Sequence, residues 1–151
     1  GMDKIIPDKW IRKAIYTAIN NMTVLDQLNS QSLQVPCFDS RVPTSNSKDY
    51  YVLLTTQTNR VDKSTKCGYR WESSILLDIV TKYSASGNPG TRLFSDNILD
   101  KARELTNNLV LDATSNLKVI KQTQEFPNDI VSFTPDENVF RKLMRIEFLI
   151  D

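Results

Sequence analysis

The sequence of 151 residues contains no histidine. It therefore has no Ser–His or Cys–His catalytic pair, no histidine-ligated metal site and no histidine pH switch. Its two cysteines, Cys37 and Cys67, are too few for a disulfide framework or a zinc site of four thiolates. They indicate a reduced, intracellular setting, with a single bridge as the alternative. Four glycines form no glycine-rich phosphate loop.

Charge of one sign and long apolar runs are also missing. Nineteen basic residues oppose eighteen acidic ones, so the net charge of +1 provides no bulk attraction to nucleic acid or to an anionic membrane. No run approaches the ~18 apolar residues of a membrane-spanning helix, and no signal-type segment follows Met2. We interpret Gly1 as an expression-tag scar. Ordinary globular composition and this length predict one domain over residues 1–151, with no membrane partner.

Two helices are predicted from apolar residues that recur with the helical period of about 3.6 residues. The first begins near Pro7 and Asp8 and buries a stripe formed by Trp10, Ile11, Ala14, Ile15, Ala18, Ile19 and Met22. The second is expected to begin at a cap on Ser95, with Phe94 and Leu99 as a hydrophobic staple. Its predicted stripe is Ile98, Leu99, Ala102, Leu105, Leu109 and Val110. Residues 23–34 are polar, and we expect a loop there with at most one helical turn.

Strands are predicted from aromatic, β-branched and alternating residues. Pro36 and Pro43 limit residues 35–43 to a short edge strand. The other expected strands are residues 50–58, 69–83, 117–124 and 139–150, with a long polar hairpin loop over 59–68. Hairpin-length loops favour antiparallel pairing. The predicted class is α+β: a mostly antiparallel sheet of about four to five strands with two amphipathic helices packed on one face.

The motifs that carry chemistry are weak. Ser45 to Lys48 matches S-x-x-K and Ser95 to Asn97 matches S-D-N, as in serine acyl-enzymes. However, Ser45 lies in a polar turn, and no Lys-Thr-Gly completes the set. We therefore predict no catalytic, cofactor-binding or metal-binding residue, and a protein that is not an enzyme.

Two charged surfaces are the better candidates. The 59–68 loop and its flank carry Arg60, Asp62, Lys63, Lys66 and Arg70 beside Tyr69 and Trp71. Such a mixture of cations and aromatic rings is typical of single-stranded nucleic-acid binding, of a protein contact or of a solvated loop. The second helix carries Asp96, Asp100 and Glu104 at four-residue spacing. That acidic stripe fits a solvated face or a subunit contact. A divalent-cation site is the third interpretation, although all of its carboxylates would come from a single helix.

The segment Trp10-Ile11-Arg12-Lys13-Ala14-Ile15-Tyr16-Thr17-Ala18-Ile19 resembles the opening helix of small tail-terminator (tail-completion) proteins of long-tailed bacteriophages and prophages. The order of the remaining segments is similar as well. A short strand runs into a proline at residues 37–43, and hydrophobic strands follow at 50–54 and 71–83. A helix at 98–109 and an alternating final strand at 145–150 complete the pattern.

This resemblance implies a non-enzymatic structural protein of the virion tail, made in the cytoplasm of a bacterial host. It implies a ring, usually of six copies, that caps the tail tube, ends tube growth and offers a docking surface for the head–tail connector. The implied partners are other copies, the tail-tube protein and the connector, with DNA only as passing cargo. The hairpin and the acidic stripe are the expected contact surfaces. Two alternatives are a head–tail connector or adaptor neck protein, and a host-encoded small ligand-binding α+β domain.

Overall fold

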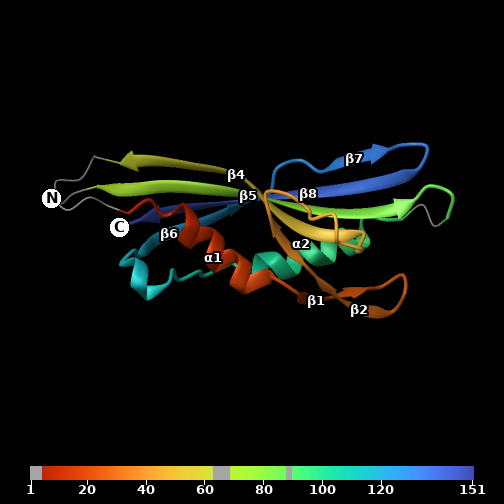
Figure 1. Cartoon of the computed structure of the whole chain (residues 1–151), viewed down its shortest axis with the longest axis horizontal. Helices are drawn as coiled ribbons and strands as arrows, with labels where there is room; N and C mark the ends of the chain where they lie inside the picture. The colour runs from red at the N-terminus through yellow and green to blue at the C-terminus, as the bar shows by residue number, and fades with distance from the viewer. Residues whose placement is uncertain (1–4, 63–68, 88–89) are drawn as a thin grey trace.

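The computed structural model describes residues 5–62, 69–87 and 90–151 (Figure 1). In these ranges five strands follow the first helix and three follow the second, an α+β arrangement that confirms the predicted class. None of the helices in these ranges is long and apolar enough to cross a membrane. In chain order, the elements are α1 (Asp8–Ile19), β1 (Met22–Asp26), β2 (Gln31–Val35), β3 (Cys37–Asp39), β4 (Tyr50–Asp62), β5 (Arg70–Ser84), α2 (Leu93–Leu105), the 3₁₀ turn η1 (Ala113–Ser115), β6 (Val119–Glu125), β7 (Ile130–Phe133) and β8 (Glu137–Ile150).

The strands form two sheets, more than the four to five strands expected. β1 and β2 pair with each other, and a six-stranded sheet has the order β3-β4-β5-β8-β6, with β7 also paired to β8. β5 and β8 stay in register from Trp71↔Ile150 to Ser84↔Glu137 and form the spine of this sheet. β6 and β7 follow one another along the outer edge of β8.

The large sheet is mixed, because β3 runs parallel to β4 while its other pairs are antiparallel. The antiparallel pairs agree with the predicted mostly antiparallel sheet, whereas the parallel pair was not predicted. The segment 40–49 instead returns the chain to the level where β3 began. Near the end of this segment, Lys48 Nζ donates to the Gln34 carbonyl at 2.9 Å, which places Lys48 beside the end of β2, shortly before β3.

The predicted loop over residues 23–34 is wrong, because the segment forms the β1–β2 hairpin. Met22 belongs to β1 and not to the first helix. α1 stops at Ile19 because Asn20 is extended and Asn21 adopts a positive φ of 59°, which asparagine tolerates. The Asn20 side chain then accepts the backbone N–H of Cys37 at 3.0 Å. In β1, buried and exposed residues alternate over only five positions, too few to be separated from a helical stripe.

One core joins the helices to the sheet. Buried residues of α1, α2, the β1–β2 hairpin and the inward face of β4, β5 and β8 belong to a single cluster. Figure 1 draws both helices and the small hairpin on one side of the large sheet. On β8 this helix-side face carries the even-numbered residues, Met144, Ile146, Phe148 and Ile150, all of which are buried. The opposite face of the large sheet therefore remains available for other contacts.

The predicted bounds of the second helix need correction at both ends. α2 begins at Leu93, whose N–H is accepted by Thr91 Oγ1 at 3.0 Å, and Ser95 is no cap. Ser95 is fully buried, and its hydroxyl donates to the Arg92 carbonyl at 2.8 Å. Phe94 therefore lies inside the helix and not at a staple position; its ring packs edge-on against Tyr50 at 5.4 Å.

The C-terminal end of α2 is fixed by β6. The Gln122 side chain donates to the Thr106 carbonyl, and Gln124 Nε2 donates to the Arg103 carbonyl at 3.1 Å. These bonds satisfy carbonyls that a helix leaves unpaired at its end. The chain leaves the helix here, so the predicted stripe does not continue: Val110 is 84% exposed.

Candidate assembly surfaces

The stem of the β4–β5 hairpin is a regular ladder where a loop was predicted. β4 continues to Asp62, with Arg60 opposite Glu72 and Asp62 opposite Arg70. Asn59 is held in the strand because its amide donates to Asp8 at the start of α1 and accepts from Ser73 of β5. Of the predicted hairpin contacts, Arg60, Asp62 and Arg70 thus lie on the stem. Lys63 and Lys66, like Cys67, lie outside the described residues.

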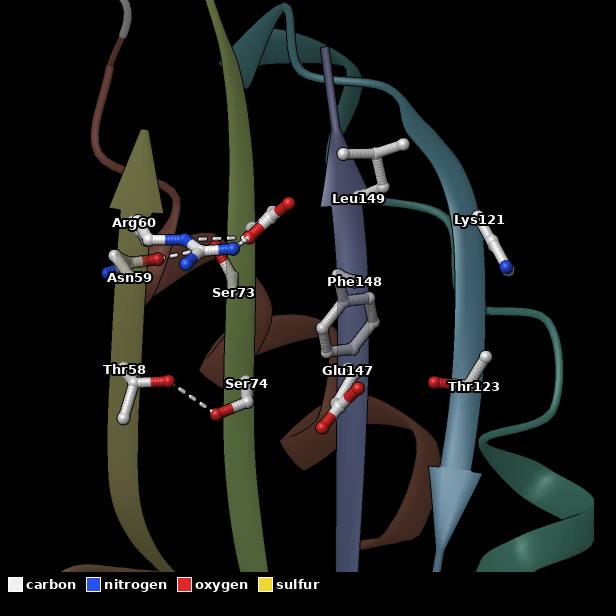
Figure 2. Close-up of a pocket in the computed structure, with 11 residues that line it drawn as sticks. Thr58, Asn59, Arg60, Ser73, Ser74, Lys121, Thr123, Glu147, Phe148 and Leu149 are labelled. Atoms are coloured by element: carbon white, nitrogen blue, oxygen red, sulfur yellow. Dashed lines mark hydrogen bonds and ion pairs between the residues drawn. The ribbon is translucent and has the colours of Figure 1, made fainter. Parts of the chain in front are cut away.

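On the sheet face away from the helices, four strands line a shallow hollow of about 670 Å³ (Figure 2). We call this the polar groove. The strand registers arrange its side chains in two cross-strand rows. One row is Thr58, Ser74, Glu147 and Thr123; the other is Arg60, Glu72, Leu149 and Lys121. Thr58 and Ser74 are joined by a hydrogen bond of 2.5 Å between their hydroxyls.

The charges of the polar groove balance. Arg60 donates to Glu72 through Nε at 2.8 Å and also through Nη2, with the two side chains 77% and 41% exposed. Within the described chain, the side chains of Glu147 and Lys121 make neither a hydrogen bond nor an ion pair, and both residues are exposed. Two acids beside two bases cannot attract a polyanion, which weighs against nucleic-acid binding here. A polar surface of both signs suits the rim of a protein contact.

The acidic stripe of α2 is exposed at all three positions, but its residues are not equivalent. Asp96 pairs with Lys142 at 2.7 Å, and Glu104 lies 4.0 Å from Lys101. The Asp100 side chain makes no hydrogen bond or ion pair within the described residues. No group of three potential metal ligands occurs in the ranges that the structure describes. The stripe is accordingly a surface with one carboxylate engaged in the fold and the others directed to solvent.

Lys142 is the buried centre of a small charge cluster. It is 8% exposed, and its Nζ contacts Asp96 and Asp129, each at 2.7 Å. Burial lowers the pKa of Lys142, but the two carboxylates outweigh burial and raise the pKa above its usual value. The cluster ties α2 and the β6–β7 connection to β8, which is a structural role.

Sequence reasoning missed a second buried charge, Asp78. It is 6% exposed on the sheet face away from the helices, where Arg141 donates to it through Nε at 3.2 Å and Nη2 at 2.7 Å. The Asp78 carboxylate raises the pKa of Arg141. The sequence did contain a signal for a buried charge, since Asp78 is the one acid in the otherwise apolar segment 75–80. Its partner Arg141 lies on another strand and could not be identified from the sequence.

The serine motifs have structural roles. Lys48 is engaged with the Gln34 carbonyl, and Ser45 is exposed in a turn. Cys37 is buried, and desolvation followed by the nearby Asp39 charge raises the pKa of its thiol to about 12. Such a thiol is a poor nucleophile.

Comparison with known proteins informs the fold. No family model matches the sequence, and no curated protein matches it. Among solved structures, the fold is similar to a chain described as "Virion of native gene transfer agent (GTA) particle", with a TM-score of 0.53 and 15% identity. The match covers 94% of this chain and 96% of that chain. At this identity the likeness establishes a shared fold.

Proposed function

We propose that this chain is a structural protein of a phage-like virion, and specifically a tail terminator. The observation that carries the proposal is the fold match to a virion chain over 94% of this chain and 96% of the other. Because nearly all of both chains align, the likeness concerns the whole arrangement of elements and not one common hairpin. The order of helix, hairpin strands, helix and final strand supports the narrower assignment, since it resembles small tail-terminator proteins.

The proposed action is binding without catalysis. Copies join head to tail into a closed ring of six, in which two different surfaces of each copy meet. The polar groove lies on the sheet face away from the helices, whereas the acidic stripe lies on α2. Each copy can therefore use both surfaces at once. The ring covers the last ring of the tail tube in the virion tail, stops its growth and presents a new surface to the head–tail connector. DNA passes as cargo, and the chain is made in the bacterial cytoplasm.

The first experiment measures the solution mass by size exclusion with light scattering over a concentration series. Six copies at 17.3 kDa each weigh about 104 kDa. A closed species near that mass is the expected result. A species that keeps growing with concentration would contradict ring closure.

The second experiment adds the protein to growing tubes of the tail-tube protein encoded by the same genome. Tubes should stop at the length reached on addition, and Glu147→Lys and Asp100→Lys should weaken the effect. Ser32→Lys, at an exposed position of β2 on neither surface, is the matched control. Binding to the portal side with no effect on tubes would favour the connector alternative. A monomer that gains thermal stability with a small molecule would favour the ligand-binding alternative.

A further inference from the structure

The outer edge of β7 carries neither a charge nor a proline, unlike the edge strands β3 and β6. β3 is three residues long and follows Pro36, while β6 carries Lys121 and Glu125 and is followed by Pro127. Short edges, charges and prolines are the usual protection against unwanted strand pairing. β7 consists of Ile-Val-Ser-Phe, without charge or proline, and within the described residues it pairs only with β8. Its outer backbone groups are available to another strand.

Exposed apolar side chains lie on both faces of this edge. Phe133 is 70% exposed, pairs with Asn138 on the helix-side face and packs edge-on against Phe140 at 6.3 Å. Ile130 is 37% exposed and pairs with Arg141 on the opposite face. An added strand with two consecutive apolar residues would bury apolar area on both faces of β7, since neighbouring residues in a strand point to opposite faces.

Among the residues that the structure describes, one pair of consecutive apolar residues outside the helices and strands has both side chains exposed. Ile5 and Ile6 precede α1, belong to no element and are 47% and 58% exposed. Pro7, the N-cap residue of α1, follows them and donates no backbone hydrogen bond. The two isoleucines are thus an unpaired apolar segment, and β7 is an unpaired apolar edge.

These two features cannot meet within one copy. Asp8, at the start of α1, is bound to β4: its carbonyl accepts from Gln57 and its side chain accepts from Asn59. Asn59 is paired with Ser73 of β5, and Ser73 is paired with Phe148 of β8. The start of α1 therefore lies level with Phe148 along β8. β7 pairs with β8 at residues 138–141. Seven residues of β8 separate Arg141 from Phe148, roughly 24 Å at ~3.4 Å per residue. Ile6 is two residues from Asp8 and reaches about 7 Å. Figure 1 likewise places the start of α1 and β7 in opposite halves of the molecule.

We propose that Ile5 and Ile6 of one copy add as a short extended segment to the free edge of β7 in a second copy, where they pack against Phe133 and Ile130. The contact is head to tail, because donor and acceptor are different parts of the chain. It deepens the proposed function and rests on its self-assembly, since it names the segment and the edge that join neighbouring copies. Strand addition of this kind takes affinity from backbone hydrogen bonds and specificity from alternate side chains.

A mixing experiment tests the contact between copies. Ile5→Ser/Ile6→Ser removes the donor and Phe133→Lys blocks the acceptor, so each variant alone should have a lower solution mass than the original chain. Mixed together, they should have a higher solution mass than either variant alone, because one retains the donor and the other the acceptor. Phe126→Lys is the matched control: Phe126 is an aromatic residue on the same sheet edge, 48% exposed, but outside β7. An equal loss of mass in the control would overturn the assignment to β7.

A peptide experiment tests the same contact without relying on ring formation. A peptide of residues 1–9 is added to the Ile5→Ser/Ile6→Ser chain, and hydrogen exchange is followed at residues 130–133. At a peptide concentration ten times Kd, exchange there should slow about tenfold, whereas the peptide with both isoleucines replaced by serine should leave it unchanged.

Absence of protection at about 1 mM peptide would overturn the proposal. The outcome is separable from that of the proposed function. A closed ring that caps tubes without this protection leaves the tail-terminator proposal standing and removes the strand contact. Protection of residues 130–133 without any closed species would support the strand contact and contradict the ring.

Discussion

Two of the ion pairs on the sheet face away from the helices, Asp78–Arg141 and Arg60–Glu72, should differ several-fold in strength. Asp78 is diagonal to Arg141 across the β5–β8 ladder, because its direct partner is Leu143. The Asp78 side chain is 9% exposed and that of Arg141 37%, whereas Arg60 and Glu72 are 77% and 41% exposed. Hydrogen bonds to buried charged groups contribute ~1.5–3 kcal/mol; we expect a coupling of about 2 kcal/mol for Asp78–Arg141, because its guanidinium is partly solvated. Exposed pairs contribute ~0.2–1 kcal/mol, which we expect for Arg60–Glu72.

Double-mutant cycles measure both couplings. One cycle uses Asp78→Asn, Arg141→Met and the double variant; the other uses Arg60→Met, Glu72→Gln and their double variant. The free energy of unfolding comes from urea denaturation followed by circular dichroism at one fixed protein concentration, because self-association changes apparent stability. A coupling for Arg60–Glu72 equal to or above that of Asp78–Arg141 would refute the reasoning from burial. The expected result also makes Arg60 and Glu72 variants suitable probes of assembly, since their folding is nearly unaffected.

Three further changes test the core, the helix end and the cysteine. Met144→Ala, at a fully buried position, should lower the free energy of unfolding by ~2–5 kcal/mol in urea denaturation. Gln122→Leu leaves the Leu109 N–H and the Thr106 carbonyl without a partner; we expect a loss of ~1–3 kcal/mol and faster hydrogen exchange at residues 106–109. With a pKa of about 12 against an ordinary 9.0, Cys37 has about a thousandfold less thiolate at neutral pH. In a Cys67→Ser chain, iodoacetamide should therefore label Cys37 only after unfolding, and labelling of the native chain at pH 8 would be the contrary result.

Long periodic segments were predictable, and so was the short edge strand β3 within the expected residues 35–43, whereas β1, β2 and β7 were not predicted. The expected strands 69–83 and 139–150 correspond to Arg70–Ser84 and Glu137–Ile150, because alternation over that many positions is unambiguous. β1 and β2 are five residues each, and their alternation was too brief to identify. At α2 the apolar spacing continued through Val110 although the helix ended at Leu105. The glutamines that fix this end lie on β6, so the stop signal was non-local.

The polar groove illustrates why contact surfaces were harder to predict than elements. Arg60 was expected in a loop with Lys63 and Lys66, but strand pairing places it in a row with Glu72, Leu149 and Lys121. These four residues come from four strands, and only the register between strands makes them neighbours. Alternation shows which face a residue occupies and leaves open which residues stand beside it. The sequence therefore indicated charge near residues 60–70 without its neutralising partners.

Charge balance gives the two candidate surfaces different responses to salt. The polar groove carries two acids and two bases, with one pair already formed, so a neighbouring copy there meets no net field. The acidic stripe keeps Asp100 free of partners within the described residues, and its attraction to a basic surface would extend over a Debye length, ~10 Å at 0.1 M salt and ~3 Å at 1 M. If copies or partners dock through the stripe, association should weaken steeply from 0.1 to 1 M sodium chloride, and Asp100→Asn should remove most of that dependence. Docking through the groove or the β7 edge should change little over the same range. A salt-sensitive assembly that Asp100→Asn leaves equally salt-sensitive would exclude the stripe as its electrostatic contact.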